Sequence, residues 1–76
     1  MTHPEYAFIL VHSTSHAIRA EKILKQAGLA SKLVPVPRQL SSDCGVCVRI
    51  ALTDQEPARR ALDAARVEID GLHSLN

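Results

Sequence analysis

The chain has 76 residues, and its nine basic and eight acidic side chains give a net charge of +1. This balance argues against a nucleic acid as the main partner, because such proteins carry a strongly basic face. One Tyr, one Phe and no Trp also leave few rings on which bases could stack. With 46% hydrophobic residues, we expect a single domain over residues 1–76 with an aliphatic core.

Neither a membrane span nor a targeting segment is expected. The longest apolar run, residues 6–11, is much shorter than the roughly 20 residues that cross a bilayer. The first residues lack the basic and apolar regions of a signal peptide. We therefore expect a cytoplasmic location, where two cysteines are more often catalytic, metal-binding or inert than joined in a structural disulfide.

The first half of the chain predicts a strand, a helix and a second strand. Residues 6–11 form a continuous apolar run, typical of a buried strand. A strand over 29–35 ends in a Pro-Val-Pro sequence, which favours the edge of a sheet. A helix is expected over 15–27, followed by Gly28 as its C-terminal cap. Its apolar residues recur at i, i+3, i+4 and i+7: Ala20, Ile23, Leu24 and Ala27.

The second half predicts a strand, a helix and a last strand. From residue 46 to 52 apolar residues alternate with others, so that Cys47, Arg49 and Ala51 share the less apolar face. A second helix is expected over 54–65, with Asp54 as its N-cap. Its apolar stripe is formed by Ala58, Ala61, Leu62 and Ala65. Residues 67–72 are expected to close the sheet as a strand.

This order predicts the α+β class, as a ferredoxin-like βαββαβ two-layer sandwich with two helices on one face of a four-stranded antiparallel sheet. The first and third strands are expected at its centre. The other sheet face then has no helix, and Phe8, Leu10 and Ala51 are expected to lie on it. Because an exposed apolar patch often marks an interaction site, we expect a homodimer or a partner complex through this open sheet face.

The stretch most suited to chemistry is Ser41-Ser42-Asp43-Cys44-Gly45-Val46-Cys47, which contains a C-x-x-C spacing. In a thioredoxin-type dithiol this spacing opens a helix. Here Cys47 belongs to an expected strand, along which the two Cα atoms would lie about 10 Å apart. A disulfide needs less than about 7 Å. The dithiol therefore requires a sharp turn at Gly45.

A metal site is another alternative. His12 and His16 have helical i, i+4 spacing and, with Cys44 and Cys47, would supply four ligands. No second pair of ligands follows the C-x-x-C motif at the usual spacing. We expect no metal and no other cofactor. The histidines are interpreted as solvated residues at a helix start, and Cys47 as a small apolar residue of a strand.

Cys44 has the features of an accessible thiol. It lies in a polar loop beside Gly45, which allows backbone N–H groups to turn toward an anionic sulfur. Arg38 and Arg49 are the nearest cations in sequence and would favour a thiolate, whereas Asp43 opposes it. An unreactive loop cysteine remains the alternative.

The sequence resembles the small bacterial family of selenium/sulfur carrier-like proteins over about residues 7–72. The most specific part is Pro37-Arg38 followed by the Ser-Ser-x-Cys-Gly sequence that ends at Gly45. The other matching segments are 12–16, 20–25, 27–28, 33–36 and 48–50. Cys44 matches the family's Cys-Gly and Arg38 its Pro-Arg, whereas Cys47 falls where small or apolar residues are common.

The resemblance implies a persulfide or selenopersulfide carrier rather than a self-sufficient enzyme. Cys44 would accept sulfur or selenium from a donor protein and pass it to an acceptor. Gly45 would let the acceptor approach, and Arg38 or Arg49 would support the anion. The alternative is a non-catalytic ferredoxin-like module that pairs through its open sheet face or binds a small ligand, with Arg49 and Cys47 as interface residues.

Overall fold

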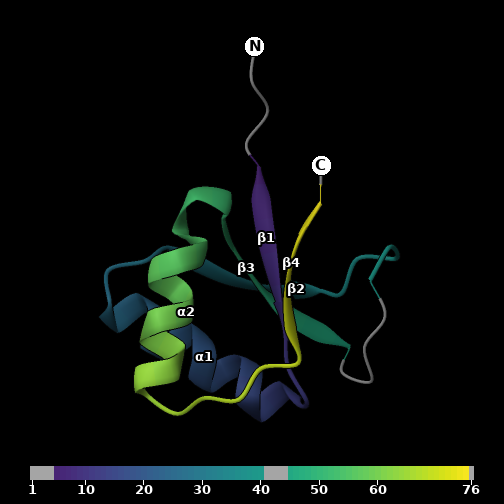
Figure 1. Cartoon of the computed structure of the whole chain (residues 1–76). Coiled ribbons are helices and arrows are strands. Elements are labelled where there is room, and N and C mark those ends of the chain that lie inside the picture. Colours follow the sequence, from purple (N-terminus) through teal and green to yellow (C-terminus); the bar gives the residue numbers. More distant parts are fainter. Residues whose placement is uncertain (1–4, 41–44, 76) are drawn as a thin grey trace.

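Strands and helices follow one another in the order β-α-β-β-α-β in the computed structural model, which describes residues 5–40 and 45–75 (Figure 1). The elements of the first half are β1 (Tyr6–Leu10), α1 (Thr14–Gln26) and β2 (Ser31–Pro35). Those of the second half are β3 (Val46–Ala51), the 3₁₀ helix η1 (Leu52–Asp54), α2 (Gln55–Ala64) and β4 (Gly71–Leu75).

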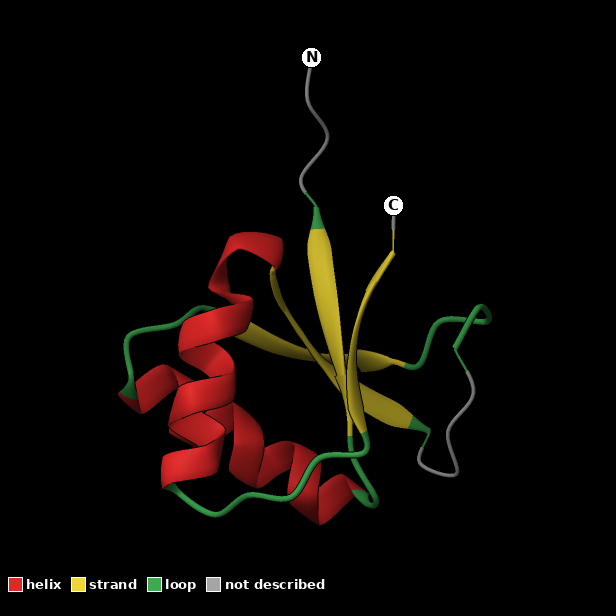
Figure 2. Ribbon diagram, in the orientation of Figure 1, coloured by secondary structure: helices red, strands yellow, loops and turns green. Residues whose placement is uncertain are grey.

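The four strands form one sheet in the order β2-β3-β1-β4, and every neighbouring pair is antiparallel. Both helices lie on the same side of this sheet (Figure 2). The ferredoxin-like α+β sandwich expected from the sequence is thereby confirmed. Strands β1 and β3 are central, and β2, which ends in a proline, is at an edge, as its sequence predicts.

The core lies between the helices and one face of the sheet. Alternation along a strand sends every second side chain to this face. The strands contribute Ala7, Ile9, Val48 and Ile50, and the helices contribute Ala17, Ala20, Leu24, Ala58 and Leu62. The small alanine side chains allow the helices to approach the sheet closely. The larger aliphatic side chains fill the remaining space between the two layers.

Helix α1 has caps at both ends. At its start, the Ser13 hydroxyl oxygen accepts a hydrogen bond from the His16 backbone N–H at 3.3 Å. After its end, Gly28 adopts a positive φ of 80°. The Leu29 N–H then donates to the Leu24 carbonyl at 2.9 Å, and the Gly28 N–H donates to the Lys25 carbonyl at 3.0 Å. This pair of bonds is the Schellman motif that the glycine predicts.

The start of α2 differs in detail from the prediction. Strand β3 ends at Ala51, one residue earlier than expected, because Leu52–Asp54 form the 3₁₀ helix η1. Asp54 is the residue before α2, as expected of an N-cap, but its side chain makes no capping hydrogen bond. An N-cap residue usually has an extended backbone. The backbone of Asp54 is instead turned, because this residue also ends the 3₁₀ helix η1 (φ −95°, ψ 7°).

The last strand begins four residues later than the predicted 67–72. Val67 is only 7% exposed and packs in the core within the connection after α2. Its N–H donates to the Leu62 carbonyl at 2.9 Å, which closes the helix end. The Asp70 N–H then donates to the Leu10 carbonyl at 2.7 Å, and pairing with β1 starts at Gly71. The apolar residues at 67 and 69 therefore reflect core packing rather than strand pairing.

Candidate functional site

The proposed reactive thiol belongs to the connection between β2 and β3. Cys44 itself lies outside the described residues, as do the other members of 41–44. The described ends of the connection are joined at the sheet, where the Val36 N–H donates to the Gly45 carbonyl at 3.2 Å. Residues 36–40 extend from this end of the sheet, away from both helices (Figure 1). The two described ends of this connection therefore lie at the same end of the sheet.

Gly45 is exposed and borders open space. A Cβ atom built on Gly45 would have no described residue within 4 Å, and the φ of Gly45 does not lie in the positive region that disfavours other residues. An alanine at this position is therefore compatible with the fold. The role expected for Gly45, the approach of an acceptor to Cys44, stays a prediction.

Arg38 occupies a turn in the same connection. The Leu40 N–H donates to the Pro37 carbonyl at 3.0 Å, and Arg38, between them, is exposed to solvent. No described carboxylate forms an ion pair with its guanidinium. The position is compatible with an anion on the neighbouring loop, and its support of a thiolate stays a prediction.

Cys47 lies in β3, as predicted, and is fully buried. Its Sγ is 4.0 Å from the Pro35 carbonyl oxygen, with which the thiol makes a long hydrogen bond. Residues 45–51 form a bend followed by a strand. A dithiol at a helix start would need helical backbone in this stretch, so this arrangement supports Cys47 as a packed strand residue.

Arg49 contacts Tyr6 rather than a described loop residue. Its guanidinium carbon lies over the Tyr6 ring, 4.2 Å from the centroid, which is a cation–π contact. Along β3 its Cα is four residues from Gly45, or about 13 Å at 3.3 Å per residue. Support of a Cys44 anion by Arg49 stays a prediction. The structure places Tyr6 and Lys32 beside Arg49, and no local sequence pattern indicates these two neighbours.

The two histidines at the start of α1 make separate contacts. His12 Nδ1 is 3.0 Å from an Asp70 carboxylate oxygen, and His16 Nδ1 is 2.7 Å from the Ser13 hydroxyl oxygen. Their rings meet edge to face with centroids 5.9 Å apart. Within 5–40 and 45–75, no group of three or more His, Cys, Asp and Glu side chains is arranged to hold a metal ion.

The open sheet face exposes less apolar surface than its sequence predicts. Leu10, on this side of β1, is only 5% exposed, and Phe8 is half-buried. Among the described residues the exposed large hydrophobic side chain is Ile18, on α1.

No described helix is both long and apolar enough to cross a bilayer.

The order and pairing of the strands place the chain among small ferredoxin-like α+β proteins. Over residues 6–74 it matches the family described as "Putative Se/S carrier protein-like", and the chain belongs to this family. It is also similar to the "Uncharacterized protein YtiA" of Escherichia coli (strain K12), with 39% identity over 44 residues. That alignment covers 58% of this chain and 51% of YtiA, so the match spans about half of that relative. No solved structure matches the chain significantly.

Proposed function

We propose that this chain carries sulfur or selenium as a persulfide or selenopersulfide on Cys44. The observation that supports this most is the family match, which spans residues 6–74 and so includes Cys44 and Gly45. Burial of the Cys47 thiol in β3 favours Cys44 as the cysteine that reacts. The exposed Gly45 beside it leaves room for the thiol of a partner protein.

The chemistry of such a carrier is a balanced exchange of one sulfur atom. The Cys44 thiolate attacks the terminal sulfur of a persulfide on a donor protein. A new S–S bond forms on Cys44, the S–S bond of the donor breaks, and the donor cysteine leaves as a thiolate. Delivery to an acceptor thiolate repeats the same step in the other direction. Neither step needs an oxidant, a reductant or a cofactor, and selenium follows the same balance.

Arg38 and Gly45 have distinct roles in this proposal. Arg38, in the exposed turn before the cysteine, supports the anionic sulfur, and Arg49 is the alternative cation. Gly45 keeps the approach to Cys44 free of a side chain. The chain is then a shuttle in the cytoplasm between a donor and an acceptor protein, not a self-sufficient enzyme.

The decisive test is sulfur uptake by cysteine variants. Purified protein is incubated with a cysteine desulfurase and cysteine, and its intact mass is measured before and after reduction with dithiothreitol. The wild type should gain the mass of one sulfur atom, which dithiothreitol removes. Cys44→Ser should gain none, and Cys47→Ala should keep most of the uptake. Thermal melts exclude unfolding as the cause, and equal uptake by wild type and Cys44→Ser would refute the carrier proposal.

A binding module without covalent chemistry is the second candidate. It is favoured by a specific observation, a hollow on the open sheet face lined by Tyr6, Lys32 and Arg49. Under this alternative a second copy or another protein covers the sheet face. Light scattering over a range of concentrations measures self-association, and a strictly monomeric species at high concentration would exclude the homodimer.

A further inference from the structure

The four strands carry their charge in a single row on the open sheet face. No strand contains Asp or Glu, and the charged residues of the strands, Lys32 and Arg49, are basic, as is His73. Lys32 on β2 is the direct partner of Arg49 on β3, Arg49 is opposite Phe8 on β1, and Phe8 is opposite His73 on β4. Residues directly opposite in a sheet project to the same face, so these four side chains cross the sheet in one line.

Lys32 and Arg49 are two positively charged residues in directly opposite positions on β2 and β3. Like charges directly opposite each other on neighbouring strands destabilise a sheet. The ion pairs of the described residues do not include either cation. The Arg49 guanidinium makes no hydrogen bond to a described residue, and its carbon lies over the Tyr6 ring. Among the described residues, these two cations therefore have no carboxylate partner.

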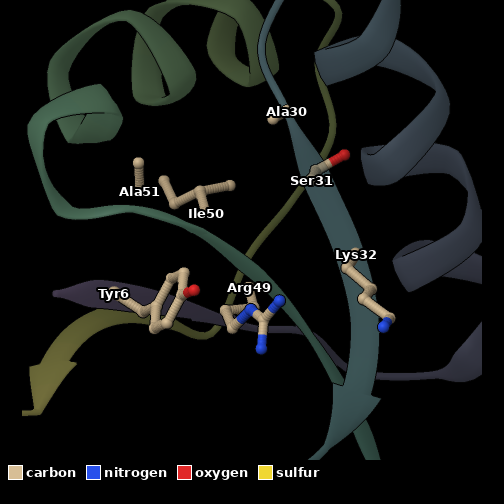
Figure 3. Close-up of a pocket in the computed structure, with 7 residues that line it drawn as sticks. All are labelled: Tyr6, Ala30, Ser31, Lys32, Arg49, Ile50 and Ala51. Carbon is tan, nitrogen blue, oxygen red and sulfur yellow. The ribbon is translucent and has the colours of Figure 1, made fainter. Parts of the chain in front are cut away.

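A hollow of about 190 Å³ lies at this position (Figure 3). Its lining comes from the start of β2, the end of β3 and the start of β1: Tyr6, Ala30, Ser31, Lys32, Arg49, Ile50 and Ala51. The volume is below the roughly 300–1,000 Å³ of pockets for drug-sized ligands. The side chains of Lys32, Arg49 and Tyr6 are displayed on the same side of the sheet (Figure 3). A small anion with a short apolar body fits this lining.

We propose that this hollow, the Tyr6–Arg49 site, binds a small molecule through a terminal oxyanion, a phosphate or a carboxylate. The guanidinium, whose carbon lies over the Tyr6 ring, presents N–H groups to two oxygens of the anion, as arginine does for carboxylate and phosphate. Lys32 adds a second positive charge from the neighbouring strand. Binding also relieves the repulsion between Lys32 and Arg49.

The site is separate from the proposed sulfur chemistry. It lies where β2 begins and β3 ends, whereas the connection with Cys44 joins the opposite ends of these strands. The inference therefore goes beyond the carrier function and does not rest on it.

The test is a titration followed by two-dimensional ¹⁵N–¹H NMR with sodium phosphate, with sodium acetate, and with sodium chloride at matched ionic strength. We expect saturable shifts of the amides of Tyr6, Lys32 and Arg49. Saturation by phosphate alone identifies a phosphate group as the ligand, and saturation by acetate alone identifies a carboxylate. Saturation by both identifies a general oxyanion site. Shifts that are absent, or that sodium chloride reproduces, would overturn the proposal.

Variants show whether the binding depends on the named cations. Arg49→Gln should weaken the affinity about tenfold or more, because a hydrogen bond between charged groups is lost. Arg49→Lys should retain part of the affinity, because the lysine ammonium keeps the positive charge but cannot donate two parallel N–H hydrogen bonds to the anion. Arg60→Gln, which removes the same charge from the exposed face of α2, should leave the affinity unchanged within about twofold. Unchanged affinity in Arg49→Gln would refute the site, and Lys32→Gln provides the same test if Arg49→Gln does not fold.

Discussion

Arg66 and Gly28 occupy equivalent positions, each the second residue after a helix, and both have a positive φ, 57° and 80°. Each helix end closes with the same two bonds: the Val67 N–H donates to Leu62 and the Arg66 N–H donates to Asp63, as in α1. Glycine adopts this conformation without penalty, whereas in other residues the Cβ comes too close to the following carbonyl oxygen. The end of α1 therefore has the preferred glycine at the left-handed position, whereas the end of α2 has Arg66, whose backbone is strained there.

Substitutions at these two positions are expected to change the free energy of unfolding in opposite directions. Arg66→Gly should raise the free energy of unfolding by about 0.5–1 kcal/mol, because the left-handed conformation no longer strains a side chain. Gly28→Ala should lower it by about 1 kcal/mol for the same reason. Urea denaturation followed by circular dichroism measures both. A less stable Arg66→Gly protein would show that contacts of the Arg66 side chain outweigh the strain.

Helix α1 is held on the sheet by few large side chains. Leu24 is fully buried, whereas Ile18 on the same helix is 54% exposed. Leu24→Ala should cost about 2–5 kcal/mol, because a cavity replaces the side chain. A core this small supplies only about 3–5 kcal/mol of net stability. We expect partial unfolding of Leu24→Ala at 25 °C.

Ile18→Ala is the matched control within the same helix. Its exposed side chain contributes little, so the expected change is within about 0.5 kcal/mol. Circular dichroism at 222 nm and urea denaturation compare the two variants with the wild type. Equal losses would mean that Ile18 is covered in solution, for example by a second copy of the chain.

The sheet carries a repulsive pair of charges, although the whole molecule is nearly neutral. Lys32→Glu converts that pair into an attractive one, and we expect a gain of about 0.2–1 kcal/mol in the free energy of unfolding. The gain should shrink as salt is added, because exposed charges are screened. The measurement is urea denaturation at low and high ionic strength. A destabilised Lys32→Glu protein would show that Lys32 and Arg49 do not repel each other in solution.

Most of the fold could be predicted from local patterns. The stripe containing Leu24, with Gly28 after it, determines α1, and the alternation around Val48 and Ile50 determines β3. The C-terminal strand was misplaced because Val67 is apolar for a reason that local sequence does not show. Val67 packs against the core from a loop, and pairing with β1 decides where β4 begins.

Less of the functional sites could be predicted. The sequence alone singled out Cys44, Gly45 and Arg38 through a short motif, because a polar loop with Cys-Gly is a local feature. The Tyr6–Arg49 site has no such local signal: Tyr6, Lys32 and Arg49 come from three separate strands. A prediction of this site needs the register that pairs Lys32 with Arg49 and the cation–π contact of Arg49 with Tyr6.

Periodicity, prolines and caps within a few residues specify the order of the elements, the two-layer architecture, the edge position of β2 and the strand position of Cys47. Three features depend instead on contacts between distant residues: the burial of Leu10 on the open face, the place of Val67 in the core, and the two cations in one hollow. The physical reason is that net charge and composition are sums over the chain, whereas burial and electrostatic repulsion depend on which distant residues the sheet places side by side.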